Sequence, residues 1–228
     1  MKKTVRFIDE GVDSLGREFL DVFTEWAEEY DAFVQGKDKQ YKEVFEDYEK
    51  ILDSIVEKSG RNVMEFGIGT GNLTEKLLNA EKNVFAVEPS RQMRELANGK
   101  LPEDFIIYDG DLQQYPIPTH KIDTIVSSYV FHHLTDEEKN SVLKQYNQLL
   151  TAGGKVIFAD TLFISEKSYK LMIEEAVDMG YAELAEDLNR EHYPMLPVVY
   201  EALKQAGFLE LSFRQMNRFV WVFEGTKK

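Results

Sequence analysis

Cysteine is absent from the sequence, and its absence removes several kinds of chemistry at once. Without thiols the chain can form no disulfide, no thiolate zinc site and no cysteine nucleophile. No apolar run approaches the ~20 residues of a membrane-spanning helix, and residues 1–13 lack the apolar core of a secretory signal. We therefore expect a cytoplasmic protein that does not bind membranes.

Basic residues are scarce relative to acidic ones. Lysine and arginine number 27 against 41 aspartates and glutamates, which gives a net charge of −14. This charge opposes nonspecific attraction to nucleic acid or to an anionic membrane surface. A chain of 228 residues with 43% hydrophobic content can bury a sizeable core. The composition favours a single-domain enzyme that acts on a small molecule.

A glycine-rich stretch lies at residues 63–73, with the sequence Val-Met-Glu-Phe-Gly-Ile-Gly-Thr-Gly-Asn-Leu. An apolar run leads into Gly67, Gly69 and Gly71, and leucines at helical spacing follow, so the pattern predicts a strand, a tight turn and a helix. Glycine permits positive φ and lets the backbone approach a ligand, while the first N–H groups of the helix face the same space. We interpret the stretch as a small-molecule binding loop.

The details of this loop bear on which ligand it holds. A dinucleotide-binding motif would have its third glycine where this chain has Asn72, and the Gly-Lys-Ser/Thr ending of a P-loop is absent. Glu65 precedes the first glycine, where a carboxylate repels phosphate and attracts a cation. S-adenosylmethionine, with its ammonium and sulfonium groups, fits better. An NAD(P)-dependent oxidoreductase and a noncatalytic sensor stay as alternatives.

Two later strands are each followed by an acidic residue. Residues 83–87 predict a strand that leads to Glu88, about 20 positions beyond the first glycine, the separation at which Rossmann-like units place an acid against ribose hydroxyls. Residues 105–108 predict the next strand, after which Asp111 can accept a hydrogen bond from an adenine amino group and Leu112 can cover the ring. The alternatives are a solvated carboxylate and an ordinary polar turn.

Adjacent histidines follow the strand predicted at residues 122–130. His132 and His133 lie at its carboxyl end, where ligands bind in open α/β sheets. Histidine serves as an acid, a base or a hydrogen-bonding group near neutral pH, so His133 is a candidate for the site, with structural packing as the alternative. We expect no metal, because neighbouring side chains diverge on a strand or a helix and no cysteine supplements them.

The remaining elements complete an alternating α/β pattern. Apolar spacing and end signals predict helices at residues 19–30, 39–58, 93–101, 135–150 and 198–206, and strands at 155–160, 209–215 and 219–223. The glycine pair at 153 and 154 is expected to end the fourth of these helices. The last two strands are close enough to form an antiparallel hairpin.

With these motifs in order, the chain resembles the class I S-adenosylmethionine-dependent methyltransferases of the small bacterial type. Residues 65–71 match the first motif of that family, Glu88 its ribose acid, and Gly110-Asp111 its adenine motif. Residues 149–154 match the approach to its fifth strand, so the resemblance covers residues 25–160. More narrowly, the chain is similar to an uncharacterised bacterial subgroup linked with methionine and sulfur recycling.

The resemblance implies a Rossmann-like α/β fold with a seven-stranded, mostly parallel sheet, an antiparallel last strand and helices on both faces. One domain would span residues 1–228, comprising a helical cap (1–60), a cofactor-binding core (61–160), a helical insert (161–197), and a last helix with a hairpin (198–228). It also implies methyl transfer from S-adenosylmethionine to a small-molecule acceptor, by a monomer or a homodimer. The expected cofactor residues are Tyr30, Glu65, Gly67, Gly69, Gly71, Glu88, Pro89, Met93, Asp111, Leu112 and Ser127.

The acceptor half is predicted from position alone, because residues 161–197 lie outside the minimal fold. An insert there can roof the acceptor pocket, or it can only pack and form an oligomer contact. The expected substrate contacts are Tyr30, His133, Arg190, His192 and Tyr193, with His133 and His192 as candidate catalytic residues. A hydroxyl or amine that must lose a proton would favour such a base, whereas a thiolate needs none.

Overall fold

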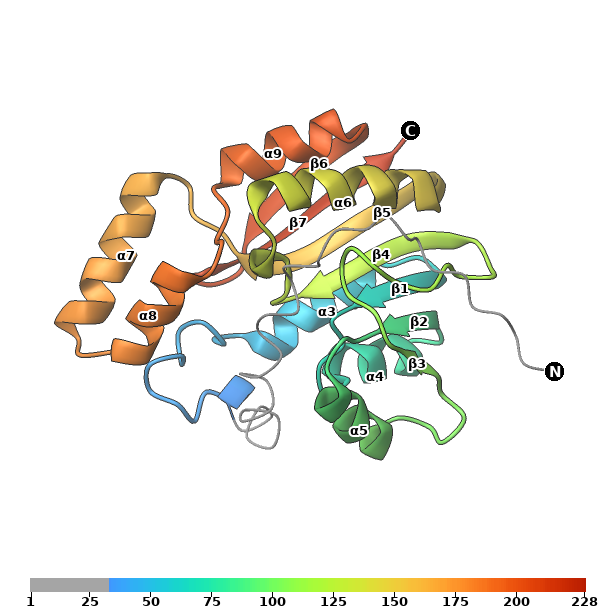
Figure 1. Cartoon of the computed structure of the whole chain (residues 1–228), viewed down its shortest axis with the longest axis horizontal. Coiled ribbons are helices and arrows are strands. Elements are labelled where there is room, and N and C mark those ends of the chain that lie inside the picture. The colour runs from blue at the N-terminus through green and yellow to red at the C-terminus, as the bar shows by residue number, and fades with distance from the viewer. Residues whose placement is uncertain (1–32) are drawn as a thin grey trace.

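The computed structural model describes residues 33–228 and places a seven-stranded sheet between layers of helices (Figure 1). The strands are β1 Asn62–Phe66, β2 Asn83–Val87, β3 Ile107–Tyr108, β4 Ile122–Ser128, β5 Leu150–Thr161, β6 Phe208–Gln215 and β7 Val220–Lys227. Their order is β3-β2-β1-β4-β5-β7-β6, and β7 runs antiparallel to both of its neighbours. The predicted fold class, including the antiparallel last strand, is confirmed.

Helices cover both faces of the sheet because successive residues of its buried strands point to opposite sides. The helices are α3 Tyr48–Lys58, α4 Asn72–Asn79, α5 Arg91–Lys100, α6 Asp136–Leu149, α7 Glu166–Asp178, α8 Ala182–Arg190 and α9 Leu196–Gln205, with a 3₁₀ helix, η2, at Phe131–His133. In β1, Met64 and Phe66 join the core beneath α6 and α9, whereas Val63 joins the core beneath α3 and α4. No helix among residues 33–228 has the length and apolar character needed to cross a bilayer.

The sheet topology creates a crevice at the carboxyl ends of β1 and β4. From β1 the chain passes outward through β2 to β3, then returns to pair β4 against the other edge of β1. Such a reversal leaves a crevice outside the strand ends, and this is where open α/β sheets bind ligands. The loops that follow β1, β2, β3 and β4 are therefore placed around one space.

The helix predicted at residues 39–58 begins only at Tyr48. The residue before it, Asp47, has a positive φ of 60°, which ends any helical path from the preceding segment. Upstream, the Asp38 carboxylate accepts bonds from the N–H groups of Gln40 and Tyr41 at 2.7 and 3.3 Å, an arrangement typical of a turn. The apolar side chains of this segment are buried as expected, but turns rather than a helix carry them. The helix predicted at residues 19–30 lies outside the described residues.

The strand boundaries differ from the prediction mainly around the glycine pair. Gly153 and Gly154 were expected to end a helix, yet that helix stops at Leu149 and β5 runs through both glycines. A Cβ on Gly154 would lie 2.9 Å from the carbonyl oxygens of Asp123 and Thr151, so the position requires glycine for close strand packing. β3 is shorter than predicted and contains only two residues.

The predicted helical insert consists of α7 and α8, which project from one side of the sheet (Figure 1). α8 is tied to the loop that precedes α3: the Tyr41 hydroxyl donates to the Asp187 carboxylate. Gln40 exchanges hydrogen bonds of 3.2 and 3.1 Å with Glu183. The insert therefore packs against the N-terminal part of the described chain, and Tyr169 on α7 also contacts Phe163 just after β5.

Candidate functional site

One cavity lies where the loops after β1, β2, β3 and β4 meet. Its walls contain the glycine loop, the turn after β2, the turn after β3, and the segment from β4 into η2. The lining residues are Tyr48, Gly67, Ile68, Gly69, Thr70, Asn72, Leu73, Glu88, Pro89, Met93, Asp111, Leu112, Gln113, Ser128, Tyr129, Val130, His133 and Leu134. The lining includes seven of the predicted cofactor residues: Gly67, Gly69, Glu88, Pro89, Met93, Asp111 and Leu112.

The glycine loop adopts a backbone that other residues rarely accept. Gly67, Gly69 and Gly71 all have positive φ, at 65°, 55° and 86°. A Cβ on Gly67 would lie 2.5 Å from the side chain of Val130, so neighbouring protein as well as backbone strain excludes larger residues. Gly71 caps the start of α4 and does not line the cavity. The turn predicted from the sequence is present, and its first two glycines, Gly67 and Gly69, line the cavity.

Glu88 is buried and points back to the glycine loop. Its two carboxylate oxygens accept bonds from the N–H groups of Gly69, at 2.9 Å, and Ser90, at 2.8 Å. Burial raises the pKa of Glu88 to about 7, and these two donors oppose the rise. Ribose hydroxyls, which would add donors to the carboxylate, would favour its ionised form. The position fits the predicted ribose contact.

Asp111 forms the polar turn after β3 and also lines the cavity, where the adenine contact is predicted. Its Oδ1 accepts bonds from the N–H groups of Gln113 and Gln114, at 2.8 and 2.7 Å, and this fixes the turn after β3. The same residue lies at the cavity wall beside Leu112, and Pro89 and Met93 add apolar surface from the turn after β2. This combination of a carboxylate and apolar walls suits an adenine ring with its amino group.

Glu65 and Ser127 lie behind the cavity rather than on its wall. The Glu65 carboxylate accepts a bond of 2.7 Å from the Thr74 hydroxyl on α4, and burial raises the pKa of Glu65 to about 8. A cationic ligand beside this carboxyl would oppose the rise in its pKa, so the attraction of Glu65 for such a ligand stays a prediction. The Ser127 hydroxyl donates to the Phe66 carbonyl at 3.1 Å and does not line the cavity. The next residue, Ser128, lines it instead. Tyr30 lies outside the described residues.

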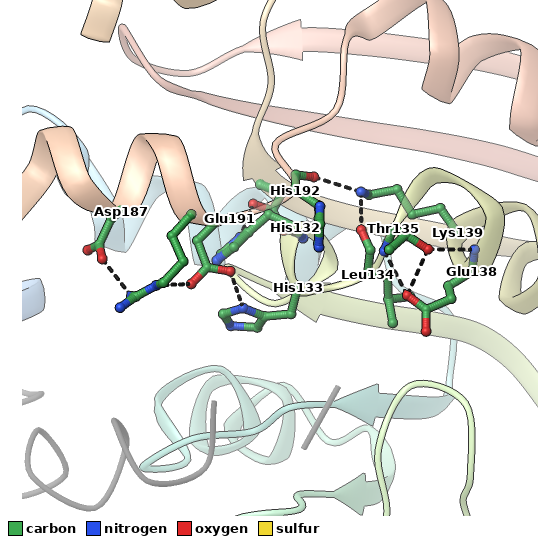
Figure 2. Close-up of polar contacts among 11 residues, drawn as sticks. His132, His133, Leu134, Thr135, Glu138, Lys139, Asp187, Glu191 and His192 are labelled. Carbon is green, nitrogen blue, oxygen red and sulfur yellow. Dashed lines mark hydrogen bonds and ion pairs between the residues drawn. The ribbon is translucent and has the colours of Figure 1, made fainter. Parts of the chain in front are cut away.

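The two adjacent histidines are each bonded to a different carboxylate. His132 Nδ1 lies 2.7 Å from Asp160 Oδ1, and His133 Nδ1 lies 3.0 Å from Glu191 Oε2 (Figure 2). Their ring centroids are only 4.2 Å apart. The expectation that the side chains diverge was wrong, because the residues lie on a 3₁₀ helix, where consecutive side chains separate less than on a strand. Ligand atoms of His132, His133 and Glu191 all lie within 4.8 Å of one another.

The two histidines differ in charge. Burial lowers the pKa of His132, but the Asp160 carboxylate outweighs this effect and leaves the pKa raised. For His133, burial and the neighbouring His132 together lower the pKa despite the Glu191 carboxylate. His133 is therefore the neutral partner near pH 7 and His132 the more readily charged one. Only His133 lines the cavity.

A buried lysine connects η2 to the end of the insert. Lys139 on α6 donates to the Leu134 carbonyl and, at 2.7 Å, to the His192 carbonyl (Figure 2). The His192 N–H in turn donates to the His132 carbonyl at 3.1 Å. Because its backbone makes these contacts, His192 turns its side chain to the surface and does not line the cavity.

Tyr193 and Arg190, which were also predicted to contact the substrate, do not line the cavity. The Tyr193 ring stacks on His132 with centroids 4.9 Å apart. Arg190 pairs with Asp187 at 2.6 Å and with Glu191 at 3.5 Å. Glu191, Asp160 and Lys139 were not predicted from the sequence as site residues. The only sequence signal for Glu191 is its place in the dense polar stretch 190–193. The hydrogen bonds that these three residues make join positions far apart in the chain.

Comparisons with known proteins agree with this geometry. Residues 64–158 match a family described as a methyltransferase domain. An uncharacterized methyltransferase of Anoxybacillus flavithermus is 52% identical over 214 residues, which cover 94% of this chain and 100% of that protein. An uncharacterized methyltransferase of Bacillus cytotoxicus is 51% identical with the same coverage.

Solved structures show the same fold at low sequence identity. A magnesium protoporphyrin IX methyltransferase from Synechocystis, with bound SAM, aligns with a TM-score of 0.67 at 16% identity, covering 96% of this chain and 100% of that one. A human N-acetylserotonin methyltransferase in complex with SAM also has a TM-score of 0.67, at 15% identity, covering 96% of this chain and 60% of that one. At these identities the likeness concerns the fold alone.

Proposed function

We propose that this chain methylates a small-molecule acceptor and releases S-adenosylhomocysteine, because it belongs to the class I S-adenosylmethionine-dependent methyltransferases. The observation that carries the proposal is the convergence of Gly67, Gly69, Glu88 and Asp111 on one cavity that also contains His133. The first four suit the cofactor, and the last offers a polar group on the acceptor side.

In the cofactor half of the cavity, residues from three loops would bind different parts of the cofactor. Glu88 would accept bonds from the ribose hydroxyls, and Asp111 would accept one from the adenine amino group. Leu112, Pro89 and Met93 line the same cavity and would cover the adenine ring. When bound, the cofactor supplies an electrophilic methyl group on a sulfonium. Glu65, Gly71 and Ser127 would support the loop from behind, and Tyr30 would approach the cofactor from the N-terminal segment.

The acceptor half would mainly supply proximity, orientation and exclusion of water. Such alignment can be worth ~7 to 11 kcal/mol of activation free energy. His133 would contact the acceptor directly. Arg190 and Tyr193 would act through their contacts with Glu191 and His132, and His192 would help to close residues 161–197 over the pocket.

A thermal-shift panel tests the cofactor. A ligand at 100 times its dissociation constant stabilises a protein by ~2.7 kcal/mol, so S-adenosylhomocysteine should raise the melting temperature and NAD should not. A response to NAD alone would refute the proposal. Incubation with methyl-labelled S-adenosylmethionine and pooled phenols, thiols, amines and carboxylates, followed by mass spectrometry, would then identify the acceptor. Absence of any turnover despite cofactor binding would favour the noncatalytic sensor.

A further inference from the structure

We infer that Glu191 holds His133 as the proton acceptor of this site, and that the acceptor is therefore a neutral hydroxyl compound, phenolic or enolic. This inference rests on the proposed methyl transfer and adds two things to it. Glu191 becomes a positioning residue contributed by the insert, and the acceptor belongs to a class that must lose a proton when it is methylated.

The geometry defines the orientation of the His133 ring. Glu191 follows directly after α8, its side chain is 5% exposed, and its Oε2 lies 3.0 Å from His133 Nδ1. A carboxylate is an acceptor, so His133 donates its Nδ1–H and the lone pair of the neutral ring is on Nε2. His133 lines the same cavity as Gly67 and Glu88. The basic nitrogen is thus placed by a residue 58 positions away in the chain.

Glu191 is itself fixed in position. Its second oxygen, Oε1, lies 3.5 Å from Arg190 Nε, and Arg190 is held by Asp187 at 2.6 Å. Asp187 also accepts the Tyr41 hydroxyl from the loop before α3. This chain of contacts orients a carboxylate toward a histidine, which is the arrangement that sets the tautomer of a catalytic imidazole.

Burial and the neighbouring His132 lower the pKa of His133, and His132 is the more readily protonated of the two rings. His132 faces it at 4.2 Å between ring centroids and is paired with Asp160 on β5. Arg190 lies beyond Glu191, and Lys139 lies beside His132. A neutral His133 is ready to accept a proton near pH 7. The adjacent His132 would limit how basic His133 becomes, so that it returns the proton to solvent afterwards.

The walls near His133 favour an uncharged acceptor. None of the residues that the structure places along the cavity is a lysine or an arginine, so an acceptor carboxylate would find no counter-charge there. Val130 and Leu134, which lie close to His133 in the chain, line the cavity together with Tyr48 and Tyr129. Aromatic and aliphatic walls suit the flat apolar body of a phenol or an enol.

The step balances without any further reactant. The acceptor oxygen forms a bond to the cofactor methyl carbon as the carbon–sulfur bond breaks, and that electron pair returns to sulfur. The hydroxyl proton moves to His133 Nε2. The positive charge that leaves the sulfonium thus appears on the imidazolium, which Glu191 stabilises. The proton passes to solvent after the product leaves.

Nitrogen-15 NMR of histidine-labelled protein with S-adenosylhomocysteine bound tests the positioning role. The chain has only four histidines, so His120→Gln, His133→Gln and His192→Gln variants assign the signals. At pH 7 we expect His133 in the form protonated at Nδ1. Because the Glu191 carboxylate raises the pKa of His133, Glu191→Gln should lower that pKa further and mix the two tautomers. Asp160→Asn is the matched control and should lower the pKa of His132 more than that of His133.

Turnover of the hydroxyl acceptors identified by the labelled-cofactor screen tests the acceptor class. We expect kcat/KM to fall as the pH drops through the pKa of His133. His133→Gln should lose roughly 10²- to 10⁴-fold, the usual contribution of a general base, and Glu191→Gln about 10-fold or more with its acidic limb moved to lower pH. Affinity for S-adenosylhomocysteine should stay within a few-fold in both variants.

Three results would overturn the inference. One is methylation confined to thiols or carboxylates, and another is an unchanged pH profile in Glu191→Gln. The third is activity that EDTA abolishes and Zn²⁺ or Mg²⁺ restores, since His132, His133 and Glu191 would then serve as metal ligands. In each case retained binding of S-adenosylhomocysteine would leave the proposed function standing, whereas loss of that binding in the wild-type protein would refute both.

Discussion

The proposed cofactor half and the proposed acceptor half of the cavity are built in different ways. Gly67, Gly69, Glu88 and Asp111 follow three successive strands that pair side by side, so each is placed by the strand before it. His133 is instead positioned by Glu191, which arrives from the insert after α8. The cofactor half depends on backbone conformation, and the acceptor half depends on side chains that meet across the fold. The two halves should therefore respond differently to substitution.

The largest effect is expected from Gly67→Val, which should abolish measurable binding of S-adenosylhomocysteine. The new side chain would collide with Val130 and would also oppose the φ of 65°. Gly153→Val is the matched control, because Gly153 has a φ of 74° but no neighbour within 4 Å of its Cβ position. Calorimetry on both folded variants separates site damage from backbone strain. Normal affinity in Gly67→Val would show that this loop is not the cofactor site.

Glu65→Gln should stabilise the protein at alkaline pH, by on the order of a few kcal/mol. Burial raises the pKa of Glu65 from 4.5 to about 8, so the unfolded chain releases this proton at a lower pH than the folded protein does. The stability that the protonated group contributes is present below pH 4.5 and is lost as the pH rises toward about 8. Gln is uncharged and can still accept the Thr74 bond.

Denaturant titrations from pH 5 to 9 check the behaviour of Glu65. The variant should show a shallower fall in the free energy of unfolding, with a residual slope from Glu88, whose pKa burial raises to about 7. Equal slopes in variant and wild type would mean that the Glu65 carboxyl is ionised in the folded protein.

Glu88→Ala should weaken S-adenosylhomocysteine binding by about 1.5 to 3 kcal/mol, the usual worth of a hydrogen bond to a charged group. The corresponding increase in dissociation constant is roughly 10- to 150-fold. Glu88→Gln, which keeps the shape of the side chain, should lose less. Unchanged affinity of the alanine variant by calorimetry would make Glu88 a structural residue that only holds Gly69 and Ser90.

The smallest effects should come from Tyr193, which stacks on His132 and does not line the cavity. Tyr193→Phe keeps the stacked ring and should change turnover little, whereas Tyr193→Ala removes a ring pair worth about 0.5 to 1.5 kcal/mol. The alanine variant should lower turnover with cofactor affinity intact. Melting curves on the same samples would identify a packing role alone, in which activity falls only in proportion to unfolded protein.

The difference between the halves also explains what the sequence could predict. The fold and the convergence of most predicted cofactor residues on one cavity follow from local patterns, because glycines at alternate positions and an acid after a strand specify backbone geometry nearby. The helix predicted from residue 39 begins only at Tyr48, because the backbone turns where the apolar spacing continues. Tyr41, Val44 and Phe45 are buried at helical spacing, but Asp38 and Asp47 turn the backbone. Apolar periodicity reports burial more reliably than it reports the backbone.

The acceptor half was only partly predictable. The sequence points to His133 by its position after a strand, but no spacing signal distinguishes its partner Glu191 from the polar residues around it. Which residue of 190–193 turns inward depends on the backbone contacts of His192 with His132 and Lys139. Such contacts form only in the folded chain, so no spacing rule reports them.

A crystal structure with S-adenosylhomocysteine bound would test the whole account most directly. We expect the ribose hydroxyls on the Glu88 carboxylate, the adenine beside Asp111 and Leu112, and the sulfur on the side of the cavity that contains His133. A ribose bound away from Glu88, or a sulfur directed away from His133, would contradict the claim that two differently built halves meet at the transferred methyl group.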